Sequence, residues 1–255
     1  MSSEPFNPDE FRMPLMEHLH ELRKRLIYCM VAAGLGCAAS FFFVEQIWAF
    51  LVAPMHDALV ATGRGSMAIT EPMEGFVTQL KVAAVAGIGG AAPVIFWQIW
   101  RFVAPGLYPK EQKFVVPLAI CSTVLFAAGL AFGYSVIFRF AFPFFLEITP
   151  ENTEAVLSIN SYLGIATKLL LAFGTCFQLP VVIFALARVG LVDHHDLVKG
   201  FRYSVVAMFV VSAMITPPDI ISQALMAGPL IFLYGIGIVV AWFFSTKERM
   251  EDFAA

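Results

Sequence analysis

Charged residues are scarce in this 255-residue chain: Asp, Glu, Lys and Arg make up 14% of it, against about 25% in an ordinary soluble domain. The chain is instead 59% hydrophobic, with a mean hydropathy of +0.79. The composition therefore excludes a disordered chain, a disulfide-rich scaffold and a typical soluble enzyme, and it indicates a protein that crosses a membrane several times. A net charge of −3 is too near neutral to indicate nucleic-acid binding.

Residues that carry catalytic chemistry are missing from the apolar stretches. None of these stretches contains a histidine, and none has an acidic residue in its middle. There is no Walker motif, and no GxGxxG lies between a strand and a helix. An intramembrane protease of the Ser–His or aspartyl type is therefore disfavoured, and so is a proton-coupled carrier, which usually needs an intramembrane acid. We expect no enzymatic activity and no cofactor.

Metal and disulfide sites are also poorly supported. The run Asp193-His194-His195-Asp196 looks like a set of metal ligands, but adjacent side chains point in different directions on a helix. We interpret it as a solvated turn that caps a helix. No CxxC spacing is present, so we expect the cysteines to be small buried hydrophobic residues. They are Cys29, Cys37, Cys121 and Cys176.

Six apolar stretches are candidates to cross the membrane, which takes about 20 residues of helix. The fifth is short because Pro217 and Pro218 cannot continue a helix, so we expect it to cross where the bilayer is locally thin. The stretches are Leu26–Val44, Val77–Trp100, Phe114–Val136, Tyr162–Ala187, Tyr203–Thr216 and Ile220–Phe244.

Basic residues alternate along the chain in a pattern that predicts its orientation. They gather before the first stretch, between the second and third, between the fourth and fifth, and after the sixth, whereas the intervening segments hold only Arg64 and Arg139. Cytoplasmic segments of membrane proteins are enriched in Lys and Arg. The pattern predicts six spans with both termini in the cytoplasm, because five spans would place Lys247 and Arg249 outside.

The whole chain, residues 1–255, is expected to form a single membrane domain. Residues 1–25 are predicted to be a cytoplasmic amphipathic segment, residues 26–244 a six-helix bundle, and residues 245–255 a cytoplasmic tail. In the first segment a stripe of leucines lies opposite charged residues at helical spacing. The simplest role of Glu21 there is an ion pair with Arg25, one helical turn later.

Glu111 is the only acid in a short, aromatic and proline-rich loop between the second and third stretches. Its simplest role is a favourable position at the start of the following helix. Two acids, Glu21 and Glu111, at a basic inner face could instead bind a cationic ligand. Guanidinium groups are the natural match, because carboxylates bind them through two hydrogen bonds.

Gln178 is the notable polar residue within the apolar stretches. A buried amide is costly unless it is hydrogen-bonded. It could bond the backbone that Pro180 loosens, or it could bond a helix that arrives from outside; the residues alone leave both interpretations open. Lys81 and Lys168 lie near the outer ends of their stretches, and we expect them to extend to the membrane interface.

Four motifs spread over the whole chain, in order, resemble those of the TatC family, the multispanning receptor subunits of the twin-arginine protein translocase. Together with six spans and a cytoplasmic N-terminus, they form a specific pattern. The motifs are residues 17–26 (EHLHELRKRL), 102–111 (FVAPGLYPKE), 172–180 (AFGTCFQLP) and 216–223 (TPPDIISQ).

The resemblance implies an all-α, concave, glove-shaped bundle of six transmembrane helices in the bacterial inner membrane. It implies a subunit that binds the twin-arginine signal peptides of folded precursor proteins and works with the single-span subunits TatA and TatB. Self-association in a multi-subunit complex and contact with membrane lipid are further implications. Transport in the family is driven by the proton-motive force without ATP, which agrees with the missing nucleotide motif.

The resemblance also implies roles for individual residues. Glu21 and Glu111 match the acids that contact the signal-peptide arginines, and Phe102, Leu107 and Tyr108 match the surrounding recognition surface. Gln178 stands where the family often has Glu, so it keeps hydrogen-bonding capacity but carries no charge. Docking of TatA-type or TatB-type helices is implied near three polar positions, which are Gln178, Thr216 and Gln223.

Five further positions match family residues that shape the backbone. Pro54 corresponds to a proline in the first outer loop, which we expect to shape the outer face. The others are Pro180, Pro217, Pro218 and Asp219.

The alternative from another class is a small-solute secondary transporter. Such a protein needs a substrate site at the midplane of the membrane, usually with charge or unwound helices. Gln178 and several prolines are its only support, and no internal repeat is visible.

The predicted topology can be tested by labelling single cysteines from one side, after the native cysteines are replaced. A probe at Ser245 should react only from the cytoplasmic side, and a probe at Gly63 only from the outside. Reaction of Ser245 from the outside alone would contradict six spans with both ends inside, as would reaction of Gly63 from the inside alone.

Overall fold

The computed structural model describes residues 15–63, 65–106, 112–148, 156–215 and 220–244. Within these ranges the chain is nearly all helical. The elements are α1 (Leu15–Phe42), α2 (Val44–Thr62), β1 (Ser66–Ala68), α3 (Glu74–Val103), η2 (Ala104–Gly106), η3 (Gln112–Phe114), α4 (Val115–Phe132), the π-helical turn η4 (Gly133–Ile137), α5 (Phe138–Ile148), β2 (Val156–Ser158), α6 (Ile159–Cys176), α7 (Leu179–Arg188), α8 (His194–Ile215) and α9 (Ile220–Phe244).

Six helical segments among the described residues are long and apolar enough to cross a membrane, which confirms the predicted number. Their limits differ from the prediction in three places. The first helix begins at Leu15, because the amphipathic segment and the first span form one continuous helix. The third continues through the π-helical turn into α5. The fifth, α8, is a full-length helix of 22 residues rather than a short one, because it begins at His194.

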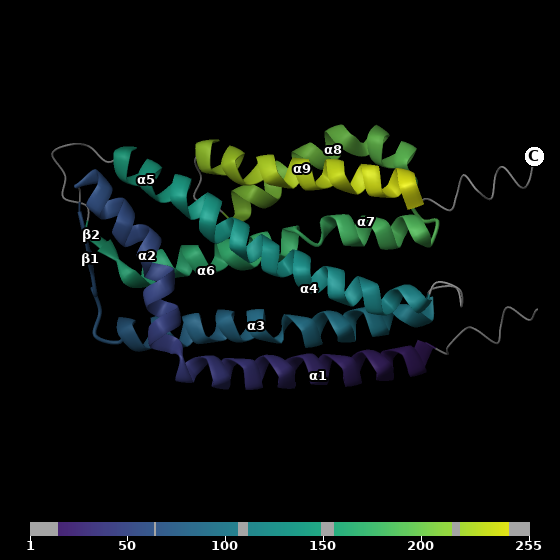
Figure 1. The fold of residues 1–255 in the computed structure, drawn as a ribbon, viewed down its shortest axis with the longest axis horizontal. Helices are drawn as coiled ribbons and strands as arrows, with labels where there is room; N and C mark the ends of the chain where they lie inside the picture. Colours follow the sequence, from purple (N-terminus) through teal and green to yellow (C-terminus); the bar gives the residue numbers. More distant parts are fainter. Residues whose placement is uncertain (1–14, 64, 107–111, 149–155, 216–219, 245–255) are drawn as a thin grey trace, which may run out of the picture.

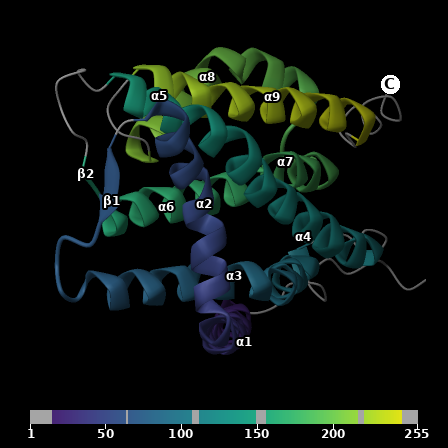
Figure 2. The same cartoon turned by 60° about the vertical axis from the view of Figure 1, so that its left-hand side comes forward.

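The helices are arranged around a central pair that is continuous in sequence, α6 and α7. In Figures 1 and 2, α1 and α3 lie side by side on one flank of the bundle, and α8 and α9 lie on the opposite flank. The segment α4–α5 crosses diagonally from the α3 side to the α9 side (Figure 1). The bundle is therefore held together through its middle, whereas α1 and α8 pack chiefly against one neighbour each, α3 and α9.

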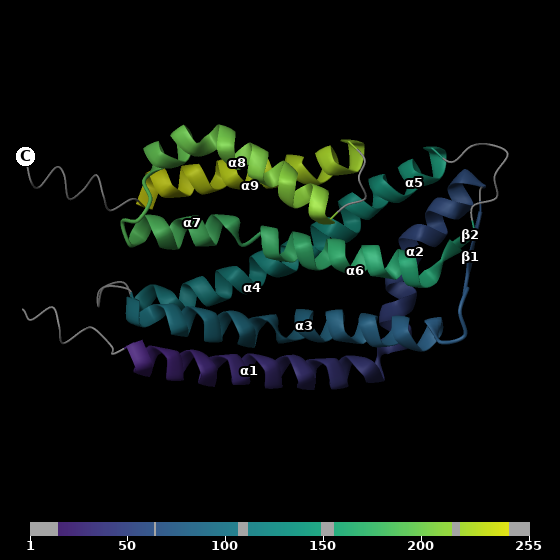
Figure 3. The same ribbon diagram turned by 180° about the vertical axis from the view of Figure 1, so that it is seen from behind.

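One end of the bundle carries both the start of α1 and the end of α9 (Figures 1 and 3). An even number of spans requires this arrangement. The same end holds most of the basic residues of the described ranges, at the start of α1, the end of α3, η3, the end of α7 and the start of α8. They are Arg23, Lys24, Arg25, Arg101, Lys113, Arg188, Lys199 and Arg202.

An aromatic core joins α5 and α6 near the opposite end. The ring centroids of Phe138 and Phe142 lie 4.9 Å apart, and those of Phe142 and Tyr162 also lie 4.9 Å apart. All three side chains are buried. The Tyr162 hydroxyl donates to the backbone carbonyl of Leu51 in α2 over 2.7 Å, so the one polar atom of this core is satisfied by a third helix.

Among the described residues, helix α2 and two short strands lie at the end of the bundle opposite the start of α1. Pro54 lies inside α2, so the segment predicted to be a loop is helical at this position; a role of Pro54 in shaping this face stays a prediction. A proline lacks the amide that a helix interior would use, and α2 accommodates it without ending. Two short parallel strands, β1 and β2, pair at this end with Met67 opposite Leu157. They connect the segment before α3 to the segment before α6.

The contact between α1 and α3 depends on two glycines. A Cβ atom on Gly36 would lie 2.4 Å from the carbonyl oxygen of Gly87, and one on Gly87 would lie 2.3 Å from the backbone nitrogen of Cys37. Small residues allow the backbones of membrane helices to approach this closely, and such close packing drives association in lipid. Since α1 packs mainly against α3, this crossing point fixes its position in the bundle.

We expect Gly36→Ala to destabilise the protein. Overpacking at the crossing costs about 1–3 kcal/mol, and the better helix propensity of alanine offsets about 1 kcal/mol of this cost. Gly34→Ala is the matched control, because its Cβ would meet nothing within 4 Å, and it should leave stability unchanged or raised. Unfolding in detergent measures both. Equal stability of the two variants would contradict the glycine crossing.

Candidate functional site

The basic end of the bundle holds a hydrogen-bonded junction between α1 and α3. The Arg25 guanidinium donates to Glu21 Oε1 from Nη2 over 2.6 Å and from Nε over 3.1 Å, which confirms the expected pair one turn apart. Arg25 Nη1 donates to Gln98 Oε1 on α3 over 2.9 Å. Arg25 thus links two helices and fixes the position of the Glu21 carboxylate.

The second oxygen of this carboxylate, Glu21 Oε2, is buried and has no hydrogen-bond partner among the described residues. A charged acceptor left without a partner is energetically costly. The Glu21 side chain as a whole is 20% exposed, but this exposure does not reach Oε2. Arg25 holds one carboxylate oxygen, and a cationic donor could bond the other only after neighbouring groups move aside.

An aromatic contact lies beside this junction. The His18 ring on α1 stacks on the Phe102 ring at the end of α3, with centroids 4.4 Å apart and planes inclined by 18°. The structure therefore brings Phe102 to the same pair of helix ends as Glu21. The other predicted recognition residues, Leu107, Tyr108 and Glu111, lie outside the described residues.

Gln178 stands at a break between α6 and α7. Its Nε2 donates to the backbone carbonyl of Ser122 on α4 over 2.8 Å. The Ser122 hydroxyl in turn accepts a buried hydrogen bond of 2.8 Å from Trp100 Nε1 on α3. Within the chain, the Gln178 side chain thus bonds another helix rather than the backbone near Pro180; its docking of an external helix stays a prediction. Ser122 consequently joins α3, α4 and the break in the fourth span.

The second predicted docking position described by the structure, Gln223, is also engaged within the chain. Its Nε2 donates to the backbone carbonyl of Phe209 over 2.8 Å and so joins α9 to α8. Pro180 lies in the first turn of α7, where the absence of an amide hydrogen is tolerated. The remaining predicted positions of the outer turn, Thr216, Pro217, Pro218 and Asp219, lie outside the described residues.

Comparison with known proteins places this arrangement in a family. The family model of the Sec-independent protein translocase protein TatC matches residues 17–229. The chain belongs to the TatC family. It is 41% identical over 245 residues to the Sec-independent protein translocase protein TatC of Desulforapulum autotrophicum, covering 96% of this chain and 90% of that protein.

Two further matches cover nearly the full length. The chain is 38% identical over 244 residues to the TatC protein of Escherichia coli, covering 95% of this chain and 93% of that protein. A crystal structure of a twin-arginine translocase receptor, TatC, matches with a TM-score of 0.79 and 33% identity, covering 88% and 97% of the two chains. This TatC chain is thus a multi-pass membrane protein of a protein-transport family. The alternative of a small-solute transporter is not supported.

Sequence reasoning missed an acid that organises the end of this TatC protein opposite the start of α1. Glu74, the first residue of α3, is 3% exposed. Its Oε1 accepts hydrogen bonds from Ser158 Oγ (2.5 Å) and the Asn160 amide (2.7 Å). Its Oε2 accepts from the Thr70 amide (2.5 Å), the Thr70 hydroxyl (2.9 Å) and the Glu71 amide (3.1 Å). The carboxylate therefore ties the start of α3 to the start of α6.

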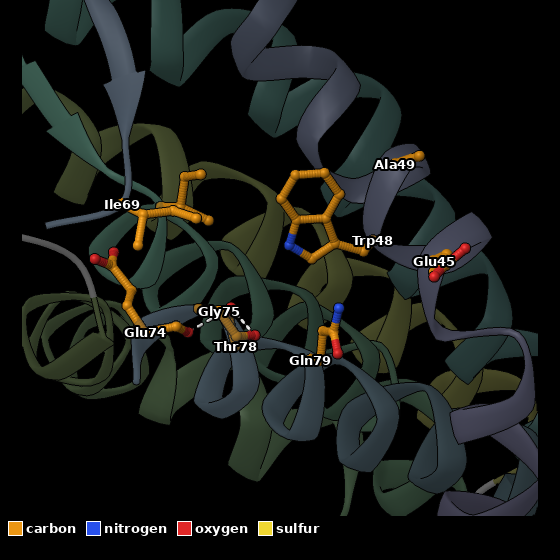
Figure 4. A pocket seen from close by; sticks show the side chains of 9 residues that line it. Glu45, Trp48, Ala49, Ile69, Glu74, Gly75, Thr78 and Gln79 are labelled. Atoms are coloured by element: carbon orange, nitrogen blue, oxygen red, sulfur yellow. Dashed lines mark hydrogen bonds between the residues drawn. The ribbon is translucent and has the colours of Figure 1, made fainter. Parts of the chain in front are cut away.

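A pocket of about 440 Å³ lies beside Glu74. In Figure 4, Trp48 from α2 faces Ile69 across it, and the Thr78 hydroxyl donates to the backbone carbonyl of Glu74 over 2.7 Å. The Glu74 carboxylate accepts hydrogen bonds from donors of its own chain. It therefore stabilises the pocket wall and is not available to bind a ligand in the pocket. Glu45 and Gln79 complete the polar lining.

The two lysines of the spans differ in their surroundings. Lys81 is exposed, and its Nζ donates to Asn160 Oδ1 on α6 over 2.6 Å, so it reinforces the link that Glu74 makes between α3 and α6. Lys168 is exposed on α6, as expected of a side chain that extends to the interface.

The Asp-His-His-Asp run begins α8, as predicted for a helix cap. The Asp193 amide donates to Asp196 Oδ2 over 3.3 Å, and the His194 amide donates to Asp193 Oδ1 over 2.6 Å. The expectation that these side chains diverge is wrong, however. Ligand atoms of Asp193, His194 and His195 lie within 4.8 Å of one another, because Asp193 precedes the helix and folds back on it.

The expectation that the four cysteines are buried is wrong. All four are free thiols, Cys121 is exposed on the outside of the bundle, and the other three are half-buried. In a membrane-spanning helix such exposure is to lipid, so a small apolar residue is still accommodated there.

We expect Gln178→Leu to destabilise the protein by about 0.6–1.7 kcal/mol, the range for hydrogen bonds between membrane helices. Gln178→Glu should retain the bond, because a desolvated carboxyl is protonated and can donate to Ser122. Ser135→Ala is the control, because the Ser135 hydroxyl donates to the carbonyl of Ala131 one turn earlier in the same helical segment. Unfolding in detergent measures the stability of all three variants. If Gln178→Leu has unchanged stability but no longer crosslinks to a partner helix, the proposed stabilising role of the bond from Gln178 to Ser122 is contradicted.

Proposed function

We propose that this chain is the signal-peptide receptor subunit of a twin-arginine protein translocase. It binds the twin-arginine signal peptides of folded precursor proteins at the basic end of the bundle. The binding surface consists of the ends of α1 and α3 together with residues 107–111. The chain then acts with TatA and TatB, in a complex that includes further copies of itself, to move the precursor across the bacterial inner membrane under the proton-motive force.

One observation carries this proposal: the buried Glu21 Oε2 without a hydrogen-bond partner among the described residues. A signal-peptide guanidinium would supply the missing donor and bring the opposite charge to a partly desolvated carboxylate. Arg25 already occupies Oε1, so the carboxylate is held in place before the ligand arrives. A preorganised acceptor loses less conformational freedom on binding than a mobile one.

Glu111 supplies the second acid of the proposed site. It matches the family motif, and its loop begins directly after η2 at the end of α3. Phe102 stacks on His18 and offers an aromatic surface next to Glu21, with Leu107 and Tyr108 proposed to extend it. Two acids for two arginines would favour a ligand with two adjacent guanidinium groups.

The orientation of the bundle supports a cytoplasmic location for this site. The start of α1 and the end of α9 lie at one end (Figure 3), and basic residues concentrate there. Because Lys and Arg are enriched on the cytoplasmic side of membrane proteins, we place both termini in the cytoplasm. The proposed site therefore faces the compartment in which precursors fold.

Docking of TatA or TatB helices is proposed near Gln178, Thr216 and Gln223. Both glutamines already donate one amide hydrogen to a carbonyl of their own chain. A partner helix would therefore meet their amide oxygens, which accept hydrogen bonds, and its contributing residues would be donors such as Ser, Thr or Gln.

We expect Glu21→Gln to weaken binding of a fluorescent twin-arginine peptide by about 1.5–3 kcal/mol, roughly 10- to 100-fold, because a charge-assisted contact is lost. Glu111→Gln should act similarly. The glutamine at 21 keeps an acceptor for Arg25, so the junction should remain folded. Fluorescence anisotropy with the purified protein measures the affinity.

The matched control is Glu17→Gln, an exposed acid one turn earlier on α1, which should bind the peptide as the unmodified protein does. A peptide with two lysines should bind more weakly, because an ammonium cannot bond a carboxylate as a planar fork. Unchanged affinity in both the Glu21 and Glu111 variants would refute the assignment.

A further inference from the structure

A groove of about 340 Å³ lies on the outside of the bundle between α4, α7 and α9. In Figures 1 and 2, α7 lies between α4 and α9, so it forms the floor of the groove. The walls are almost wholly apolar. Lining residues include Pro117, Cys121 and Leu125 from α4, Phe184 from α7, and Ile236 and Val240 from α9.

Aromatic rings close one end of the groove. The rings of Phe114 and Phe184 meet edge to face with centroids 6.4 Å apart, and those of Phe184 and Phe244 meet at 5.1 Å. These contacts join the start of α4, the end of α7 and the end of α9. This is the end of the bundle that carries the start of α1 and the end of α9.

Two cations stand at the same end. Lys113 Nζ lies 5.4 Å from the centroid of the Phe114 ring, and the guanidinium carbon of Arg188 lies 4.9 Å from it. Both positive groups therefore converge on one ring at the mouth of an apolar groove. A ligand that fits both features has a negative head and an apolar tail.

The dimensions of the groove favour a narrow tail. From Phe114 to Leu125 the helix rises about 16 Å at 1.5 Å per residue, close to the hydrocarbon thickness of one leaflet, about 15 Å. A helix about 10 Å wide would fill more than about 1,000 Å³ over that length, roughly three times the volume of the groove. An acyl chain is much thinner than a helix.

We propose that this groove binds one anionic phospholipid. One acyl chain lies along α7 between α4 and α9, and the phosphate lies at Lys113 and Arg188. Basic groups at the membrane surface attract anionic lipid heads, and a guanidinium matches phosphate oxygens in geometry. The groove is lined by α4, α7 and α9 and includes no residue of the junction between α1 and α3.

Native mass spectrometry of the delipidated, detergent-purified protein tests the charge requirement. Phosphatidylglycerol should bind about tenfold more tightly than phosphatidylcholine with the same acyl chains. The double variant Lys113→Gln, Arg188→Gln should lose this preference for phosphatidylglycerol. Lys113→Gln alone should lose part of it, and this variant leaves the fold intact because Lys113 is exposed. Lys199→Gln removes an exposed cation at the same end and should keep the preference.

The groove itself is tested by filling it. Cys121→Phe should abolish phosphatidylglycerol binding, whereas Val124→Phe, which changes an exposed residue of α4 outside the groove, should not. Glycerol 3-phosphate, which has the charge but no acyl chain, should fail to compete. The melting temperature of each variant in detergent confirms that it is folded.

Three results would overturn the proposal. The first is that the double variant keeps the preference for phosphatidylglycerol, or that Lys199→Gln loses this preference as fully as the double variant does. The second is full competition by glycerol 3-phosphate, which would reduce the site to a simple anion site. The third is a photocrosslinker at position 121 that captures a single-span protein instead of lipid in the intact complex.

Discussion

The hydrocarbon core offers no partner for a free backbone amide or carbonyl, and this constraint shapes every irregular segment of the chain. The deepest break, between α6 and α7, shows how it is met. The Gln178 amide donates to the Thr175 carbonyl, and the Gln178 carbonyl accepts from Val181 and Val182, so the turn stays bonded although Pro180 lacks an amide. The side chain of Gln178 then bonds α4 at Ser122. The break is tolerated because both its backbone and its amide side chain have partners within the chain.

The acidic residues at the two ends of the bundle differ in how many hydrogen bonds they accept. At the end opposite the start of α1, Glu74 accepts five hydrogen bonds and has no capacity left for a ligand, so its charge serves only to join α3 to α6. At the basic end, Glu21 has one oxygen bonded by Arg25 and one without a partner among the described residues. The difference between a structural and a binding carboxylate thus lies in the number of donors that the fold brings to it.

Local patterns in the sequence predicted what local physics determines. Apolar length predicted six spans, and i,i+4 spacing predicted the pair of Glu21 and Arg25. Contacts between distant segments could not be predicted in this way. No sequence pattern marked Glu74, because its donors Ser158 and Asn160 lie more than 80 residues away. The acceptor of Gln178 is a backbone carbonyl, which no side-chain pattern marks.

The attachment of α1 follows from two contacts of opposite chemistry. Within the helices, Gly36 and Gly87 let the backbones of α1 and α3 touch, and at the basic end Arg25 bonds Gln98. The span of α1 has no buried residue in its most apolar window, so these contacts hold a helix that is otherwise exposed to lipid. A ligand that draws on Glu21 acts on the polar contact alone. The glycine crossing keeps α1 in place while the charges at its end rearrange, which allows the proposed site to bind and release a peptide without dismantling the bundle.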